Sequence, residues 1–170
     1  YNGTNKKNIY PTPVIGGVGL IKEIENPVNH LFKKENSFIL LIGKTFGHLS
    51  QSALFHEVFS VNEGPPPDVN LINEKNNGEI ILSLINKKLI NSAHDVSSGG
   101  VIMSLAEMSM SSGMGVKIEK PKKLSNLFEY FFGEDQGRYV VEINKDKLSL
   151  VQNLLKENNV FSEVVGVTQK

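Results

Sequence analysis

Apolar residues along this chain follow two kinds of pattern, short continuous runs and stripes at helical spacing. The run at residues 37–43, SFILLIG, is almost wholly apolar and predicts a buried strand. Residues 99–112 carry Val101, Leu105 and Met108 along one face and predict the clearest helix. Shorter patterns predict further strands at residues 91–95, 116–119, 138–143 and 161–168 and helices at residues 50–59, 69–90, 124–132 and 148–155.

Several local signals refine this outline. Residues 14–24 alternate glycine with β-branched residues and predict a strand that another backbone approaches closely. Asp68 and Asp146 are expected to cap the helices that follow them, and Asn76-Asn77-Gly78 is expected to break the first of these. About five strands mix with four or five helices without strict alternation, which predicts one α+β or layered α/β domain over residues 1–170.

Composition and charge exclude several classes of function. The chain has 18 basic and 18 acidic residues, so it lacks the basic excess typical of proteins that bind nucleic acid or anionic membranes. It has no cysteine, which excludes disulfides, thiolate nucleophiles and zinc–cysteine sites. Its longest apolar run, residues 38–42, is far below the ~20 residues of a membrane span. The start at Tyr1, in a polar stretch, predicts a piece of a longer protein. Of the basic residues 17 are lysine and one is arginine, Arg138.

Familiar phosphate and metal signatures are incomplete. Gly43-Lys44-Thr45 follows a predicted strand, but Phe38 stands where a P-loop requires its first glycine. Gly16–Gly19 likewise lacks the last glycine of a dinucleotide fingerprint, since Lys22 occupies that position. The histidines show no ligand-pair spacing, so we predict no metal site in the chain. They are His30, His48, His56 and His94.

The strongest local signal is a turn between a strand and a helix. The predicted strand ends at His94-Asp95, and Ser97-Ser98-Gly99-Gly100 leads into the long helix. Free N–H groups at a helix start carry positive partial charge, and glycine lets a phosphate approach the backbone. The same residues also suit plain capping, with Ser97 or Ser98 as the N-cap. The spacing does not choose between these interpretations.

A second signal is the glycine-bounded turn at residues 133–138. Glu134, Asp135, Gln136 and Arg138 crowd together there, ahead of a predicted strand. These groups could bind a polar ligand or form local ion pairs. Charged loop residues are most often simply solvated, which favours the structural interpretation.

Five ordered strings together resemble one known family. They are PTPVIGGVGLI, LIGKTFGHLSQSALFHEV, GPPPDVNL, AHDVSSGGVIMSLAEM and FGEDQGRYVV. Over roughly residues 1–168 they resemble the C-terminal part of the phosphoribosylformylglycinamidine synthase family. The resemblance implies an ATP-dependent carbon–nitrogen ligase of purine biosynthesis. That enzyme converts formylglycinamide ribonucleotide, ATP and glutamine-derived ammonia into formylglycinamidine ribonucleotide, ADP and phosphate.

The resemblance also carries expectations about architecture and partners. It implies the second C-domain of the synthetase, a layered α/β/α unit on a mixed sheet with partial ferredoxin-like topology. ATP and Mg²⁺ are then bound mainly outside this chain, which supplies no catalytic residue or metal ligand and is inactive alone. The implied partners are the N-terminal domains of the same synthetase, a glutaminase and a small-molecule nucleotide substrate, in the cytoplasm. An exposed apolar face left by the missing domains could drive homodimerisation of the fragment.

The family pattern places the two loops at a ligand site. Ser97–Gly100 matches a glycine-rich loop in which the family commonly has Asp at position 98; Ser98 therefore weakens a metal-facing role and leaves backbone anion binding. Glu134-Asp135-Gln136 stands where the sister domain has a Glu-Ser-Gln substrate loop. With His94 and Asp95 it is expected to line either the reacting site or a pseudo-symmetric auxiliary nucleotide site.

The sequence leaves open which group Arg138 contacts and which function the chain serves. We expect Arg138 to make a bidentate, structural contact to Glu134, Asp135 or another carboxylate, in preference to a bound phosphate. A non-catalytic scaffold that holds a structural nucleotide is the alternative function. A related ATP-dependent enzyme on the same scaffold, such as AIR synthase, selenophosphate synthetase, thiamine-phosphate kinase or a hydrogenase maturation factor, is the other.

Overall fold

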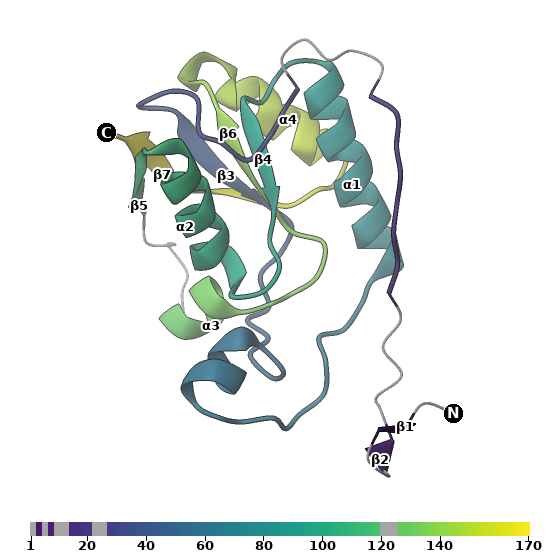
Figure 1. Ribbon diagram of the computed structural model, residues 1–170. Coiled ribbons are helices and arrows are strands. Elements are labelled where there is room, and N and C mark those ends of the chain that lie inside the picture. The colour runs from purple at the N-terminus through teal and green to yellow at the C-terminus, as the bar shows by residue number, and fades with distance from the viewer. Residues whose placement is uncertain (1–2, 5–6, 9–13, 22–26, 120–125) are drawn as a thin grey trace.

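A five-stranded sheet carries the fold in the computed structural model, which describes residues 3–4, 7–8, 14–21, 27–119 and 126–170. The strands lie in the order β4-β6-β3-β7-β5 (Figure 1). Every pairing in this sheet is antiparallel, so the mixed sheet implied by the resemblance is not what forms. The strands are β3 (Phe38–Ile42), β4 (Ser92–Asp95), β5 (Gly115–Ile118), β6 (Tyr139–Ile143) and β7 (Ser162–Gln169).

The order of the strands gives a ferredoxin-like topology. β3 and β4 both run antiparallel to β6 between them, and are therefore parallel to each other. They are joined through α1 (Leu71–Asn86). β6 and β7 are related in the same way across β3 and are joined through α4 (Leu148–Glu157). Two interleaved β-α-β units thus confirm the expected partial ferredoxin-like topology. The segment α2–β5–α3 is inserted between them.

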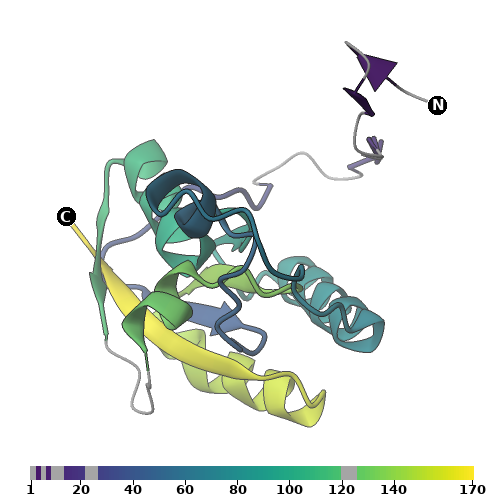
Figure 2. The ribbon, with the colours of Figure 1, turned by 90° about the horizontal axis from the view of Figure 1, so that it is seen from below.

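Alternating side chains divide the core into two layers. Leu40 and Ile42 of β3 pack in one cluster with apolar residues of α1 and α4. Ile39 and Leu41 pack on the opposite face with residues of α2 (Gly100–Ser112) and α3 (Leu127–Phe132). The view in Figure 2 shows the helices on both sides of the sheet. The α+β class and the α/β/α layering are therefore confirmed.

The first helix differs from its sequence prediction at two places. Asn70, and not Asp68, is the N-cap of α1, because its Oδ1 accepts from the N–H groups of Ile72 and Asn73 at 3.1 and 3.0 Å. The predicted break at residues 76–78 does not occur. Asn77 is buried, and its Nδ2 donates to the Gly137 carbonyl at 2.8 Å. A tertiary contact thus overrides the local turn signal.

Two other predicted helices start or end differently. Residues 145–147 form a 3₁₀ turn before α4, so Asp146 does not cap that helix. The helix predicted at residues 50–59 shrinks to a π-helical turn, Leu54–Val58. α3 spans Leu127–Phe132; residues 124–125 of its predicted range lie outside the described residues. No helix in the described ranges has the length and apolar character needed to cross a bilayer.

The N-terminal part of the chain lies apart from the layers. Strands β1 (Gly3–Thr4) and β2 (Lys7–Asn8) pair only with each other (Figures 1 and 2). The strand predicted at residues 14–24 is wrong over 14–21, which pair with no strand, while 22–24 lie outside the described residues. Gly16, Gly17 and Gly19 have open space where a close backbone was expected. A strand needs a partner, and within the described residues that segment has none.

A buried carboxylate fixes the point where the chain enters the sheet. Glu142 of β6 is fully buried and accepts from the backbone N–H groups of Lys33 and Lys34 at 2.8 and 3.0 Å. It also accepts from Asn91 Nδ2 and Ser92 Oγ, each at 3.2 Å. Burying a carboxylate is costly unless it is hydrogen-bonded, and here four donors meet that need.

Candidate functional site: a polar cavity between two loops

A polar cavity of about 360 Å³ lies at one end of the sheet. Asp95, the last residue of β4, pairs with Tyr139, the first residue of β6. This pairing places the two loops singled out in the sequence, residues 94–100 and 133–138, next to each other. Six of the predicted site residues line the cavity: Asp95, Ser97, Ser98, Glu134, Gln136 and Arg138.

The start of α2 is capped by a carboxylate from the other loop. Gly99 is the N-cap residue, with φ of 79° and no side-chain capping bond of its own, so neither serine is the cap. Glu134 Oε1 accepts from the Gly99 N–H at 2.7 Å and from the Ala53 N–H at 2.8 Å. The Gly100 N–H donates to the Ser97 carbonyl at 3.1 Å.

These bonds correct the phosphate-binding expectation for the two glycines. The N–H groups of Gly99 and Gly100 are engaged within the chain and are not offered to a ligand. Ser97 and Ser98 are exposed, and among the described residues their N–H groups have no partner. An anion in this cavity would therefore contact Ser97 and Ser98, because the Glu134 carboxylate already neutralises the positive end of α2.

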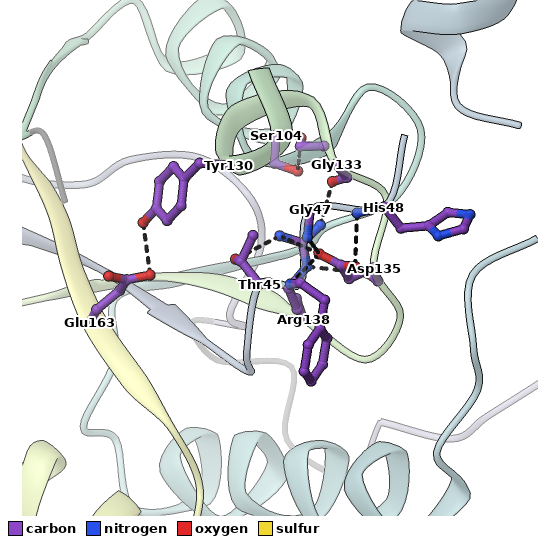
Figure 3. A network of polar contacts seen from close by, with 11 residues as sticks. Thr45, Gly47, His48, Ser104, Tyr130, Gly133, Asp135, Arg138 and Glu163 are labelled. Atoms are coloured by element: carbon purple, nitrogen blue, oxygen red, sulfur yellow. Dashed lines mark hydrogen bonds and ion pairs between the residues drawn. The ribbon is translucent and has the colours of Figure 1, made fainter. Parts of the chain in front are cut away.

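Asp135 points away from the cavity. Its Oδ2 accepts from the N–H groups of Phe46 and Gly47, both at 2.9 Å, and its Oδ1 accepts from the His48 N–H at 3.2 Å (Figure 3). The residue is 5% exposed. Asp135 therefore does not line the cavity, and its visible role is to hold the loop after β3; its place near a ligand site stays a prediction.

Arg138 is buried beneath the same loop, with 1% of its surface exposed. Its guanidinium donates to the carbonyls of Asp135 (3.1 Å) and Gly133 (2.5 Å) and to Thr45 Oγ1 (3.0 Å) (Figure 3). The Asp135 carboxylate lies 3.8 Å from Nη1. The contact is structural, as expected, but it is not bidentate. Burial lowers the pKa of Arg138, the Asp135 carboxylate opposes this, and the guanidinium remains charged.

Replacing Arg138 with lysine is expected to lower the free energy of unfolding by about 2 kcal/mol, because an ammonium group cannot reach all three acceptors of the fork. Urea denaturation of the 170-residue chain measures the change. Lys87→Arg, on an exposed residue, is the matched control and is expected to have no measurable effect. Equal unfolding midpoints for Arg138→Lys and the unmodified chain would contradict the assigned role.

The remaining predicted residue, His94, faces away from the cavity. Its Nε2 lies 3.0 Å from Glu107 Oε2 on α2, and its Nδ1 lies 2.6 Å from the Asp95 carbonyl. This geometry couples β4 to α2, and His94 is not among the cavity-lining residues; its place near a ligand site stays a prediction.

Two cavity residues lie outside the two loops singled out in the sequence. Glu74, in the first turn of α1, lies against Gly137, and Tyr139 begins β6. No local signal marks Glu74, because it lies 63 positions from Gly137. Burial, and then the charges of Glu74 and Asp95, raise the pKa of Tyr139. With Glu134 the cavity has three carboxylates among its lining residues, and the hydrogen-bond donors beside them are the hydroxyls of Ser97 and Ser98 and the amide of Gln136.

Similar proteins share both the sequence and the fold. Residues 34–170 match the family described as AIR synthase related protein, C-terminal domain. The phosphoribosylformylglycinamidine synthase subunit PurL of Pelagibacter ubique is 50% identical over all 170 residues, and that of Rhodopseudomonas palustris (strain HaA2) is 39% identical over 168 residues. The chain spans 23% of the length of each.

Solved structures agree on the fold. T. maritima PurL complexed with FGAR has a TM-score of 0.71 at 18% identity, over 84% of this chain and 25% of that one. HypE, a hydrogenase maturation protein from E. coli, has a TM-score of 0.60 at 14% identity, over 84% of this chain and 46% of that one. At these identities the solved structures show the fold alone. From the family match and the shared fold together, the chain belongs to the AIR-synthase-related C-terminal domain family.

Proposed function

We propose that this chain is a domain of a phosphoribosylformylglycinamidine synthase, the ligase that forms formylglycinamidine ribonucleotide. The observation that carries the proposal is 50% identity to a PurL subunit across all 170 residues, including both cavity loops. HypE, a hydrogenase maturation protein with the same fold, is 14% identical. The order and spacing of the family strings support the same assignment over the related ATP-dependent enzymes.

In this reaction the protein acts mainly by positioning the substrates, because ATP and ammonia supply the reacting groups. ATP transfers its γ-phosphoryl group to the amide oxygen of formylglycinamide ribonucleotide, and ADP leaves. Ammonia then adds to the activated carbon, and phosphate leaves with the former amide oxygen. Ser97, Ser98 and Gln136 line the cavity and supply hydrogen-bond donors for a phosphate or ribose group. We assign no catalytic residue to this chain; its part is to hold one ligand in register.

Nucleotide is the cofactor that the related structures support. T. maritima PurL structures are complexed with ATP, ADP and AMPPCP. Mg²⁺, when bound, would offset charge on the phosphates. Within the described residues no group of three or more His, Cys, Asp or Glu side chains could hold a metal ion. The described part of the chain therefore supplies no metal centre of its own.

The partners proposed are the rest of the synthetase and a glutaminase. The chain spans 23% of its relatives, so the larger part of such a protein lies outside it. Residues 14–21 expose Val14, Val18 and Leu20 at 95–104% of their surface, and we propose that the preceding domains cover them. The same apolar segment would drive self-association of the isolated chain. A glutaminase partner is supported by the T. maritima PurLQS structure.

The 170-residue chain alone is expected to form no detectable amidine product. The full-length synthetase that contains it is expected to release ADP and phosphate one-for-one with amidine, when given formylglycinamide ribonucleotide, ATP and ammonium. Coupled ADP release and product detection by mass spectrometry measure both. Product from the chain alone, or ATP hydrolysis by the full-length protein that ignores the ribonucleotide, would contradict the proposal.

A scaffold that holds a structural nucleotide is the second candidate function. It is favoured by the capped start of α2, since Glu134 already occupies the N–H group that a reacting phosphate would use. Isotope-labelled ATP separates the two. Nucleotide held by the cavity would exchange at the rate of turnover in a reacting site, and would stay unlabelled through many turnovers in a scaffold.

A further inference from the structure

The loop at residues 133–138 contacts three other segments of the chain. It receives hydrogen bonds from the loop after β3, from the π-helical turn and from the start of α2. We propose that Asp135 is the positioning residue of the polar cavity: by holding residues 46–48 it fixes Glu134 at the start of α2 and Gln136 at the cavity wall. The effect on ligand affinity rests on the proposed function, whereas the effect on the loop does not.

Adjacent side chains of this loop point to opposite sides. The Glu134 carboxylate reaches Gly99 and Ala53, and the Asp135 carboxylate reaches residues 46–48. One peptide unit joins the two, so a rotation that released one carboxylate would displace the other. Charge-assisted bonds from three backbone N–H groups make Asp135 the stronger of the two anchors.

Hydrogen bonds run in both directions between the loop after β3 and the loop at residues 133–138. Asp135 accepts from the His48 N–H, and the His48 carbonyl accepts from the Glu134 N–H at 2.9 Å. The backbone of Glu134 is therefore placed by His48, which Asp135 holds. A chain of contacts runs from Asp135 through His48 and Glu134 to Gly99, which follows the cavity-lining Ser98.

The contacts that join residues 133–135 to residues 45–48 and to Gly99 form a brace, and Arg138 is part of it. Its guanidinium donates to the carbonyls of Gly133 and Asp135 and to Thr45 Oγ1. Both ends of residues 133–135 and the first residues after β3 are thus tied to one side chain. Asp135 itself is 5% exposed and is not among the cavity-lining residues, so it acts through Glu134 and Gln136 and not by ligand contact.

Glu142 provides a matched control for Asp135. It is another buried carboxylate that accepts backbone N–H groups, but it lies at the opposite end of β6 and its partners are Lys33, Lys34, Asn91 and Ser92. Asp135→Asn and Glu142→Gln each replace one buried carboxylate oxygen with an NH₂ group that faces N–H donors. Only the first change should reach the cavity.

Amide hydrogen exchange in the 170-residue chain tests the inference. Asp135→Asn is expected to accelerate exchange at Ala53 and Gly99, the two donors to Glu134, by about tenfold relative to Glu142→Gln. Faster exchange confined to residues 46–48, or equal acceleration in both variants, would overturn it. If Asp135→Asn does not fold, Thr45→Val removes one bond of the same brace and should accelerate the same two amides by about threefold. Unchanged amides in that variant would also overturn it.

A second arm uses the full-length synthetase. At a temperature where both variants are folded, Asp135→Asn is expected to raise KM for ATP or for formylglycinamide ribonucleotide by about tenfold with kcat within about threefold, and Glu142→Gln to leave both parameters unchanged. Equal kinetics in the two variants would overturn the positioning role. A wild-type enzyme without turnover would instead refute the proposed function, and the exchange experiment would still decide the role of Asp135.

Discussion

Alanine at position 100 is expected to destabilise the 170-residue chain by about 3–4 kcal/mol, because it combines a positive φ with a steric overlap. Gly100 has φ of 71°, and a Cβ there would lie 2.6 Å from the Phe131 carbonyl oxygen and 2.8 Å from that of Gly133. These are backbone atoms at the end of α3, so they cannot rotate aside. The expected shift is measurable by thermal or urea denaturation.

Gly113 supplies the control for this substitution. It ends the same helix with φ of 68°, but no neighbouring atom lies within 4 Å of the position that an alanine methyl group would take. Gly113→Ala should therefore show the backbone cost alone, about 1 kcal/mol. Similar losses in the two variants would mean that the contact between α2 and α3 does not constrain position 100.

Glu142→Ala is expected to cost about 3 kcal/mol, because it leaves buried donors without an acceptor. The N–H groups of Lys33 and Lys34 and the side chains of Asn91 and Ser92 would all lose a partner. Denaturant midpoints of the 170-residue chain measure the loss, and the exposed Glu157 on α4 provides a control, since Glu157→Ala should change stability little. A small loss for Glu142→Ala would mean that water replaces the carboxylate.

The core was predictable because its signals are local. The continuous apolar run of β3 and the apolar stripe of α2 each predict a buried element, and burial follows from them directly. The capping of α1 was missed by two residues, since Asp68 and Asn70 are equally suitable cap residues on sequence grounds. Only the geometry of the chain after the proline run decides between them.

The two loops of the site were predictable from the sequence, but the directions of their side chains were not. Ser97 and Gln136 were singled out because each lies in a glycine-containing polar turn, one after a strand and the other before a strand. The directions of Glu134 and Asp135 could not be found, because their partners lie 35 to 89 positions away in sequence. Arg138 was singled out from composition, because it is the one arginine among 17 lysines. In the structure its guanidinium donates to several acceptors at once, as a lysine could not.

The strand order has a consequence for synthesis on the ribosome. β3, at Phe38–Ile42, is the central strand, and its neighbours β6 and β7 begin 101 and 124 residues later in the chain. Until residue 139 has left the exit tunnel, the nascent chain therefore carries an unpaired FILLI segment with no sheet to join. Such segments are the ones that chaperones cover and that aggregate when they are not covered.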